Sequence, residues 1–238
     1  MKRYILFVAA LLGAISLNAQ VAEPVEPQPT AFVSDSKGET ADLTPGGDFS
    51  GEAPVMVTLS ANAEETEGYS LVIMWTFKRE GESEPYLTRY DSDVEIAIET
   101  SGVTIIQSTI TYTSNENSEI YWEYVCDPFR IILAESSLEV PNAFSPNGDG
   151  INDYFNVYNA KSIVSFHAAI FNRWGQQLYS WGLEGIGCEE CGWDGTYNGK
   201  PVKAGVYFVV VKAKGADGIE YEFRRDVNLL RGYNESGN

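Results

Sequence analysis

The first half of the chain is a series of short runs in which apolar and polar residues alternate. Val, Ile, Thr, Tyr and Trp dominate these runs, and polar turn segments separate them at a spacing of roughly 10 residues. Alternation with a period of two places successive side chains on opposite faces of a strand, and many short strands at this spacing are typical of a β-sandwich. The pattern predicts six strands, at residues 55–59, 71–77, 94–98, 103–112, 120–125 and 129–133.

The second half carries strand patterns of its own. Residues 163–171 alternate, whereas residues 206–211 are apolar on both faces, which predicts a central strand. The Gly-Ala-Asp-Gly turn at residues 215–218 returns the chain into residues 219–230, so these two strands are expected to form a hairpin. The chain as a whole is therefore predicted to be all-β, with two β-sandwich domains.

Charge divides the chain into two parts. The protein has 238 residues, with 34 acidic and 16 basic side chains and a formal net charge of -18. Residues 21–140 hold 23 acidic and 5 basic side chains, whereas residues 141–238 hold 11 and 9. This break predicts an acidic domain at residues 31–138 and a nearly neutral one at residues 139–238. The acidic excess argues against nucleic-acid binding, because phosphate contacts need clustered Lys and Arg.

The N-terminus has the pattern of a secretory signal peptide. Lys2 and Arg3 precede an apolar run at residues 4–15, and residues 1–19 are predicted to be removed on export. The alternative, a membrane anchor, is disfavoured because the run is shorter than the roughly 20 residues that span a bilayer. Residues 20–30 hold three prolines between acidic residues and are predicted to be an extended linker.

The acidic domain resembles immunoglobulin-like domains of the polycystic-kidney type. The resemblance rests on the residues from Ala53-Pro54-Val55 to the strand that carries Trp75. Trp75 has apolar neighbours on both sides along its strand, so it is expected in the core and not as a ligand platform.

Five separated motifs in the second half resemble the type B C-terminal sorting domain of the Bacteroidetes type IX secretion system, also called the gliding-motility-associated C-terminal domain. They run from the loop at residues 141–153 through Asn172-Arg173-Trp174-Gly175 to Arg231. The residues that match are Pro141, Asn142, Phe144, Pro146, Asn147, Gly148, Asp149, Gly150, Asn152, Asp153, Asn172, Arg173, Trp174, Gly175, Trp193, Asp194, Gly195, Gly205, Tyr207 and Arg231.

The resemblance implies an exported cargo protein. Its partners would be the outer-membrane translocon and the components that recognise the folded C-terminal domain, and its destination would be the cell surface or the extracellular space, associated with the outer membrane. Aromatic residues beside turns commonly cover the open end of a small sandwich, so Trp174 and Trp193 are both expected in the core.

One loop has the oxygen-rich composition of a calcium site. Asn147, Asp149, Asn152 and Asp153 place four side-chain oxygen donors within seven residues. Ile151 stands where an EF-hand loop has a ligand, which counts against that geometry. The alternative is a set of Asx-turns, in which these side chains bond their own backbone and asparagine could replace aspartate. No cofactor is assigned; calcium is kept as the weaker alternative.

The cysteines allow two interpretations. Cys188 and Cys191 could join Cys126 and His167 in a zinc site by count, but a zinc site usually draws on two local pairs of ligands. Because the chain is predicted to be exported, a Cys188–Cys191 disulfide is favoured, with Cys126 as a buried thiol in a strand.

No motif of a hydrolase or phosphate-binding enzyme occurs, and the protein is predicted not to be an enzyme. His167, the only histidine, is expected to be a half-exposed residue of a strand. The preferred function is an exported surface interaction module, adhesion-like, whose acidic domain binds an unknown partner or glycan. The alternatives are a regulatory accessory of the secretion machinery, sensed at the envelope, and a small hydrolase.

Overall fold

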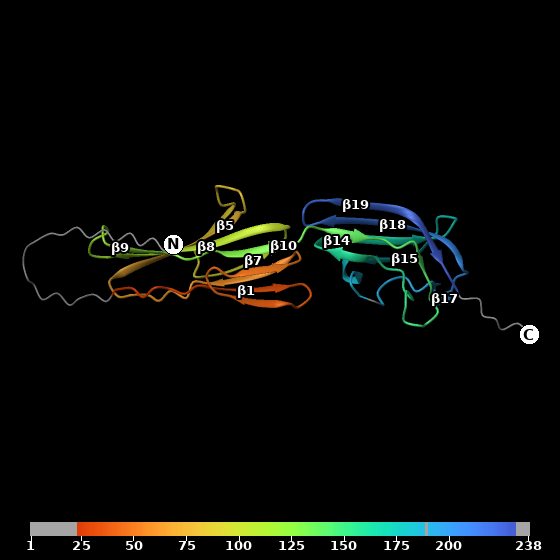
Figure 1. Cartoon of the computed structure of the whole chain (residues 1–238), viewed down its shortest axis with the longest axis horizontal. Helices are drawn as coiled ribbons and strands as arrows, with labels where there is room; N and C mark the ends of the chain where they lie inside the picture. The colour runs from red at the N-terminus through yellow and green to blue at the C-terminus, as the bar shows by residue number, and fades with distance from the viewer. Residues whose placement is uncertain (1–22, 189, 232–238) are drawn as a thin grey trace, which may run out of the picture. The chain divides into compact units, whose positions relative to one another are not determined.

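The computed structural model describes residues 23–188 and 190–231 (Figure 1). These residues form 19 β-strands and one short 3-10 helix, η1 (Leu183–Gly185), and no α-helix is present among them. No helix in the described part of the chain is long and apolar enough to cross a membrane. The prediction of an all-β protein is confirmed. The predicted signal peptide and the first residues of the predicted linker lie outside the described residues.

The chain divides into two compact units, with the main division between Leu133 and Ala134. We call them the N-terminal unit and the C-terminal unit; residues 52–54 and 99–101 group with the second. The charge pattern placed the join a few residues later, at 138/139. Leu138 belongs instead with the second unit because its side chain is buried in the core of that unit.

Two sheets, one antiparallel and one mixed, make up most of the N-terminal unit. The first has the order β2 (Thr40–Leu43), β1 (Thr30–Asp35), β4 (Val55–Ser60) and β7 (Asp93–Ile98). The second has the order β3 (Asp48–Gly51), β10 (Phe129–Leu133), β8 (Gly102–Ser114), β5 (Tyr69–Arg79) and β6 (Leu87–Arg89), and β9 (Tyr121–Val125) also pairs with β8. β3 is parallel to β10.

All six strands predicted for this unit are present. Burial alternates along β4, β8 and β10, whereas β9 has no buried residue. Trp75 on β5 is fully buried, so its expected place in the core is confirmed. The pattern missed β1, β2, β3 and β6, three of which have only three or four residues. Such short segments contain too few alternating positions to stand out from a turn.

The proline-rich segment before β1 is packed and not free. Pro24, Pro27 and Pro29 are all buried. The Tyr124 hydroxyl donates a hydrogen bond of 2.9 Å to the carbonyl of Pro24, and Asn62 Nδ2 donates one of 2.9 Å to the carbonyl of Gln28. Residues 23–29 are therefore an extended edge of the N-terminal unit, whereas the sequence predicted a linker.

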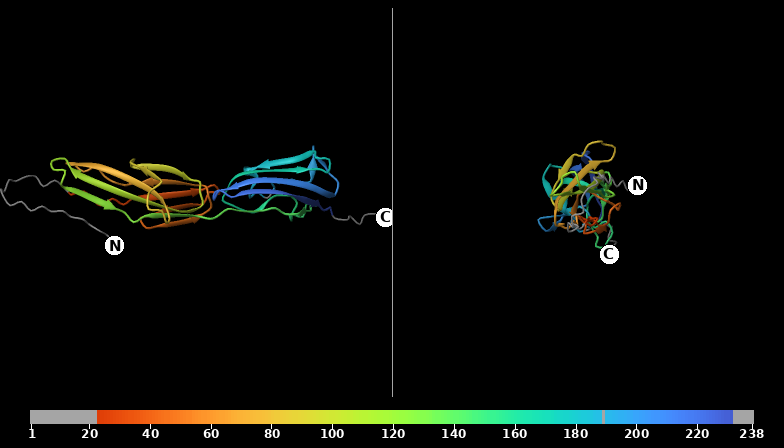
Figure 2. Two further views of the ribbon diagram at one scale, coloured as in Figure 1. Left: turned by 90° about the horizontal axis from the view of Figure 1, so that it is seen from above. Right: turned by 90° about the vertical axis from the view of Figure 1, so that its left-hand side faces the viewer.

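A five-stranded sheet forms the C-terminal unit. Its order is β12 (Ala143–Phe144), β19 (Glu220–Leu229), β18 (Gly205–Gly215), β14 (Ile163–Phe171) and β15 (Gln177–Gly182). β18 and β19 form the predicted hairpin and run side by side in the views of Figures 1 and 2. Two short ribbons complete the unit, β11 (Ser137–Glu139) with β13 (Tyr158–Lys161) and β16 (Thr196–Tyr197) with β17 (Lys200–Pro201).

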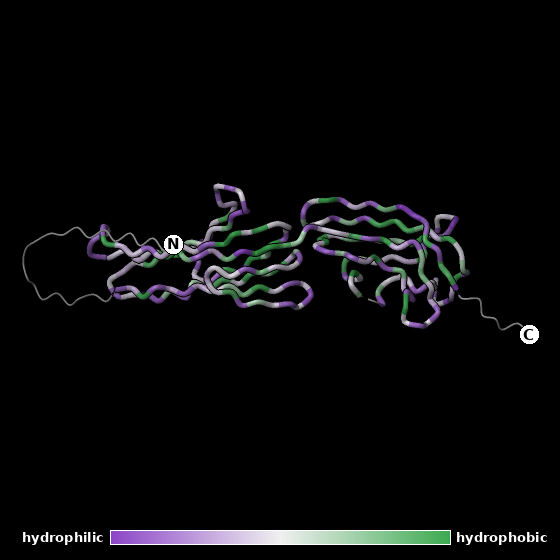
Figure 3. Tube along the Cα trace, viewed as in Figure 1, coloured by the Kyte–Doolittle hydropathy of each residue, from purple (hydrophilic) through white to green (hydrophobic). Residues whose placement is uncertain are grey.

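β18 is central in the sheet, but only one of its faces is buried. Val209 and Val211 point into the core, whereas Val206 and Phe208 are 50% and 42% exposed. Figure 3 shows how apolar the strand is along its length. The prediction of a central strand is confirmed, although the second layer of this unit covers only one of its apolar faces.

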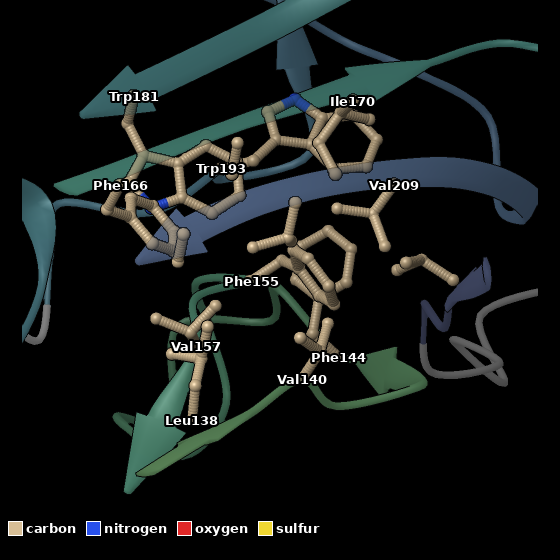
Figure 4. Packing of buried hydrophobic residues seen from close by; sticks show 14 of the residues in the cluster. Leu138, Val140, Phe144, Phe155, Val157, Phe166, Ile170, Trp181, Trp193 and Val209 are labelled. Atoms are coloured by element: carbon tan, nitrogen blue, oxygen red, sulfur yellow. The ribbon is translucent and has the colours of Figure 1, made fainter. Parts of the chain in front are cut away.

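That second layer consists largely of irregular chain at residues 138–157. Its side chains pack against β14, β15 and β18, as Figure 4 shows. Phe144 lies 5.3 Å from Trp193 and 5.8 Å from Phe155, measured between ring centroids. The residues that contribute to this core from the layer are Leu138, Val140, Phe144, Phe155 and Val157. Segments that look like loops in the sequence thus supply five of the 17 buried residues of this core.

Candidate recognition site in the C-terminal unit

The oxygen-rich segment at residues 145–153, which we call the Asx loop, is organised around one carboxylate. Asp153 Oδ1 accepts hydrogen bonds from the backbone N–H groups of Asn147 (2.8 Å) and Gly148 (2.7 Å), and Oδ2 accepts one from Gly150 (2.8 Å). The bonds from Gly148 and Gly150, with that from Asn147, lower the pKa of Asp153 although desolvation opposes them. Gly148 and Gly150 have φ values of 80° and 82°, a left-handed conformation that favours glycine.

The remaining side chains of the Asx loop also bond within the loop. Asn147 Oδ1 accepts from the N–H of Asp149 at 3.1 Å, and Asp149 Oδ1 accepts from the N–H of Ile151 at 2.8 Å. Asn147 Nδ2 donates to Asp149 Oδ2 at 2.8 Å. Each is a two-residue bond of the Asx-turn type.

These bonds bear on the calcium hypothesis. The carboxylates of Asp149 and Asp153 face N–H donors of their own loop, an arrangement suited to Asx-turns. Across residues 23–188 and 190–231, no group of three or more His, Cys, Asp or Glu residues is placed to hold a metal ion. The geometry favours the structural interpretation, and calcium binding stays a prediction to be tested.

Trp193 anchors a second motif to the core. Its side chain is fully buried, as expected, and its Nε1 donates to the carbonyl of Thr196 at 2.8 Å. Asp194 Oδ1 accepts from both the N–H (2.9 Å) and the hydroxyl (2.8 Å) of Thr196. Gly195 follows with φ of 76°, and a Cβ there would lie 2.9 Å from Leu229. The Trp-Asp-Gly motif is thus a tight turn packed on β19.

Three motif residues from distant parts of the sequence meet around this turn. Arg231 Nη2 donates to the carbonyl of Gly195 at 3.0 Å. The ring of Tyr207 lies 5.0 Å from that of Trp193, its hydroxyl donates to the carbonyl of Lys203, and burial raises its pKa. These contacts are structural, since they hold the end of the hairpin to the rest of the unit.

The Asn172-Arg173-Trp174-Gly175 motif forms the turn between β14 and β15. Asn172 Oδ1 accepts from the N–H groups of Trp174 (3.0 Å) and Gln176 (3.1 Å), and Gly175 has φ of 79°. Trp174 is 81% exposed, and the guanidinium of Arg173 lies 5.2 Å from its ring. The expectation that Trp174 lies in the core is wrong: the turn directs it outward.

Apolar surface continues from this turn onto the sheet. Phe171, the last residue of β14, is half-buried and lies opposite the exposed Phe208 in the strand register. Val206 lies two residues from Phe208 and on the same face of β18. Phe171, Phe208 and Val206 therefore place large apolar side chains on the uncovered face of the sheet, and the exposed Trp174 lies in the turn that follows Phe171. We call these four residues the outer apolar surface.

Cys188 and Cys191 are joined in a disulfide, with their Cα atoms 5.2 Å apart. Sulfur atoms in a disulfide are not thiolates, so Cys188 and Cys191 cannot be zinc ligands while they are bonded to each other. Cys126 is not disulfide-bonded and is half-buried just after β9. The expectation of a buried thiol within a strand is therefore wrong. His167 is exposed on β14, opposite Lys212 in the register, where a half-exposed position was expected.

Comparison with known proteins bears out the resemblance of the second half. Residues 138–223 match the model of the CHU_C Type IX secretion signal domain family. The match spans the Asx loop, the Arg173-Trp174 turn, the Trp-Asp-Gly turn and most of the hairpin. It supports export of the chain as a cargo of type IX secretion. A search of curated proteins found no match.

Three solved structures are distantly similar. The chicken CNTN1 FN1-FN3 domains are 11% identical, with 86% of this chain and 90% of that chain covered and a TM-score of 0.29. The fibronectin(III)-like modules of Clostridium thermocellum CbhA are 10% identical (82% and 94% covered, TM-score 0.22). BcpA, the major pilin subunit of Bacillus cereus, is 8% identical (86% and 67% covered, TM-score 0.29). At these TM-scores the likenesses carry no inference for this protein.

Proposed function

We propose that the protein is a non-enzymatic cargo of the type IX secretion system, that its folded C-terminal unit is the export signal, and that its acidic N-terminal unit is an interaction module at the cell surface. The family match at residues 138–223 supports the export route. The proposal that the folded C-terminal unit is the export signal rests on which motif residues the structure buries and which it leaves exposed.

The motif residues fall into two groups with different physical roles. Trp193, Phe144 and Tyr207 are buried and build the core, so they act through folding. Arg173 and Trp174 contribute no buried surface to that core, yet their turn is held in one conformation by Asn172. Exposing a tryptophan forfeits the stabilisation that its burial would bring. Trp and Arg are also the residues most enriched at the centres of protein interfaces.

The observation that carries the proposal is therefore the 81% exposure of Trp174 on a rigid turn. Together with Arg173 and the outer apolar surface, it supplies aromatic, apolar and cationic groups at and beside the end of β14. A signal of this kind exists only in the folded domain, because β14, β15 and β18 bring its residues together.

The N-terminal unit has the character of a charged interaction surface. Its large acidic excess gives it a negative potential, which favours encounter with basic partners and weakens association with anionic surfaces. Tyr86 and Tyr90 are exposed beside β6, and aromatic residues of this kind are common in binding surfaces. This supports a module that binds a partner outside the cell.

A reporter fusion tests the export signal. Residues 134–238 would be fused behind an inert secreted reporter and expressed in strains with and without a working type IX translocon. The fusion begins at Ala134, because a start at residue 139 would remove β11 and Leu138. We expect reporter on the surface, accessible to added protease, only in the strain with the translocon.

Variants of the fusion separate recognition from folding. Trp174→Ala and Arg173→Ala should leave the melting temperature nearly unchanged and strand the reporter in the periplasm. Ile219→Ala is the matched control, since Ile219 is also exposed but lies in the turn of the hairpin. Normal export of the Trp174→Ala fusion would overturn the recognition role of this turn. Reduced export of other cargo after deletion of the whole protein would favour the accessory role instead.

A further inference from the structure

A cleft of about 800 Å³ lies in the C-terminal unit, beside the Asx loop. Its other wall is the disulfide-closed segment that includes Cys188 and Glu190. The floor contains the nearly buried side chains of Phe144 and Val157, which belong to the core shown in Figure 4. The cleft has a size typical of small-molecule or side-chain sites, and an apolar base with polar groups at its edge is the usual composition of such sites.

Two tyrosines line the cleft and supply aromatic surface. Tyr154 is half-buried, and Tyr158 is 48% exposed. A hydrogen bond with Glu139, together with the charge of that carboxylate, raises the pKa of Tyr158.

The lining is anionic. Asp153 and Glu190 both contribute carboxylates, and the residues that line the cleft include no Lys or Arg. A nearby cation, Arg225, does not line the cleft: it donates to the carbonyl of Val140 at 2.7 Å and lies 5.5 Å from the ring of Phe223, although its charge acts on Tyr158 against that of Glu139. A negative cleft with aromatic walls attracts a cation that also has flat apolar faces.

We infer that this cleft binds the side chain of an arginine presented by an extended segment of a partner protein. The planar guanidinium can stack on the ring of Tyr154 or Tyr158 while its N–H groups reach the carboxylate of Glu190. Lysine offers a point charge without the planar face, so arginine fits better. A neutral sugar would gain nothing from the net charge of the lining, and an anion would be repelled.

The inference does not depend on how the protein is exported. The cleft and the Arg173-Trp174 turn share no residue, and the proposed export signal could fail while the cleft still binds arginine.

Titration of the purified full-length protein with two short peptides tests the inference. The first is acetyl-Gly-Arg-Gly-amide; the second carries citrulline, which replaces the charged guanidinium by a neutral urea of nearly the same shape. Binding would be measured by peptide-observed NMR at low salt and again at about 1 M salt, where screening acts over roughly 3 Å. We expect the arginine peptide to bind several-fold tighter than the citrulline peptide and to lose this advantage at high salt.

Variants locate the site. Glu190→Gln should weaken binding of the arginine peptide by about two- to five-fold, as for a partly exposed ion pair. Tyr154→Ala should weaken it to a similar extent through loss of the aromatic face. Glu220→Gln is the control, since Glu220 is an exposed carboxylate on β19 and does not line the cleft. It should leave binding unchanged.

Four outcomes would overturn the inference. The first is absence of binding with the arginine peptide at about 1 mM and in 10-fold excess over the protein. The second is equal binding of the citrulline peptide, and the third is equal weakening of binding by Glu220→Gln. The fourth is tighter binding of a neutral trisaccharide such as maltotriose. Circular dichroism and melting of each variant would show that it is folded. Glu190 takes no part in the hydrogen bonds that shape the Asx loop, so its substitution tests binding without altering that loop.

Discussion

Phe155 and Trp193 exchange two backbone hydrogen bonds, from the N–H of Phe155 to the carbonyl of Trp193 (2.8 Å) and from the N–H of Trp193 to the carbonyl of Phe155 (3.0 Å). Both side chains are fully buried, and the pair lies outside the named strands. This short bridge joins the irregular layer at residues 138–157 to the Trp-Asp-Gly turn. It holds two sequence motifs, about 40 residues apart, in one core.

The bridge predicts that Gly192 tolerates no side chain. A Cβ at this position would collide with the carbonyl oxygen of Phe155 and would lie 2.7 Å from its carbonyl carbon, so Gly192→Ala must push two backbone segments apart. We expect a loss of about 1–3 kcal/mol in the free energy of unfolding, the usual cost of overpacking. Urea unfolding would measure it, with Ser180→Ala on the exposed face of β15 as the control. An unchanged urea midpoint for Gly192→Ala would show that the bridge is not rigid.

The Asx loop predicts that the two aspartates respond differently to substitution. Both oxygens of Asp153 accept backbone hydrogen bonds, so Asp153→Asn turns one acceptor into a donor that faces an N–H group, and the melting temperature should fall. Asp149 accepts one backbone bond, which asparagine can also accept, so Asp149→Asn should cost less. This geometry argues against the expectation that asparagine could replace Asp153 at little cost, and the melting temperatures of the two variants test it.

Calcium should leave the melting temperature of the wild-type protein unchanged. The physical reason is that the loop carboxylates already face internal N–H donors. The measurement is a melting curve in millimolar calcium and then in chelator. A rise of several degrees in calcium that disappears in both Asp149→Asn and Asp153→Asn would establish a calcium site, since a ligand at 100 times its dissociation constant adds roughly 2.7 kcal/mol to stability.

The hydrogen bonds that Asp217 accepts connect the start of the C-terminal unit to the hairpin turn, and we expect this connection to weaken in acid. Burial raises the pKa of Asp217, but hydrogen bonds from the hydroxyl and N–H of Ser136 and from the N–H of Ile219 outweigh it, and the pKa is lowered overall. A folded-state pKa below the unfolded value means that the stabilisation is present above the unfolded pKa and is lost as the pH falls through the folded pKa. The pKa of Asp153 is lowered as well, so the two effects add in the same pH range.

We therefore expect the urea midpoint to fall as the pH drops below about 4, the pKa of aspartate in an unfolded chain. Asp217→Asn should start from a lower midpoint at pH 7 and should show a shallower fall. Midpoints measured between pH 7 and pH 3 for the wild type and the variant would check this. Parallel curves would contradict a role for the Asp217 carboxylate.

Cys188 and Cys191 should be recovered as one linked peptide from unreduced protein. Their Cα separation of 5.2 Å is within the range of disulfides, and an exported chain meets oxidising conditions. Mass spectrometry with and without reductant is the measurement. Two free thiols at these positions, or one equivalent of bound zinc, would contradict the prediction. Because the bridge closes a loop of only four residues, replacing both cysteines by serine should lower stability modestly.

Local patterns in the sequence were sufficient for the longer paired strands and for an approximate division of the chain. Alternation along β4, β5, β7, β8 and β10 is visible because the side-chain period of a strand is a property of the backbone itself, independent of what packs on it. The same holds for the β18–β19 hairpin, whose turn residues lie next to one another in the chain. The change in charge along the chain and the sorting-domain motifs are also local features of the sequence. The family match at residues 138–223 bears out the motifs.

Burial, in contrast, was decided by tertiary structure. Trp174 is followed by Gly175 and Trp193 by Asp194-Gly195, so both stand beside a turn. Trp174 is nevertheless 81% exposed, whereas Trp193 is fully buried. Val206 and Val209 belong to one apolar run, but only Val209 faces the layer formed by residues 138–157. Whether a face of a sheet is covered depends on segments tens of residues away, and no local pattern specifies where that cover ends. For the same reason the exposure of Trp174 and the walls of the arginine cleft emerge only when the sheet and the irregular layer are assembled.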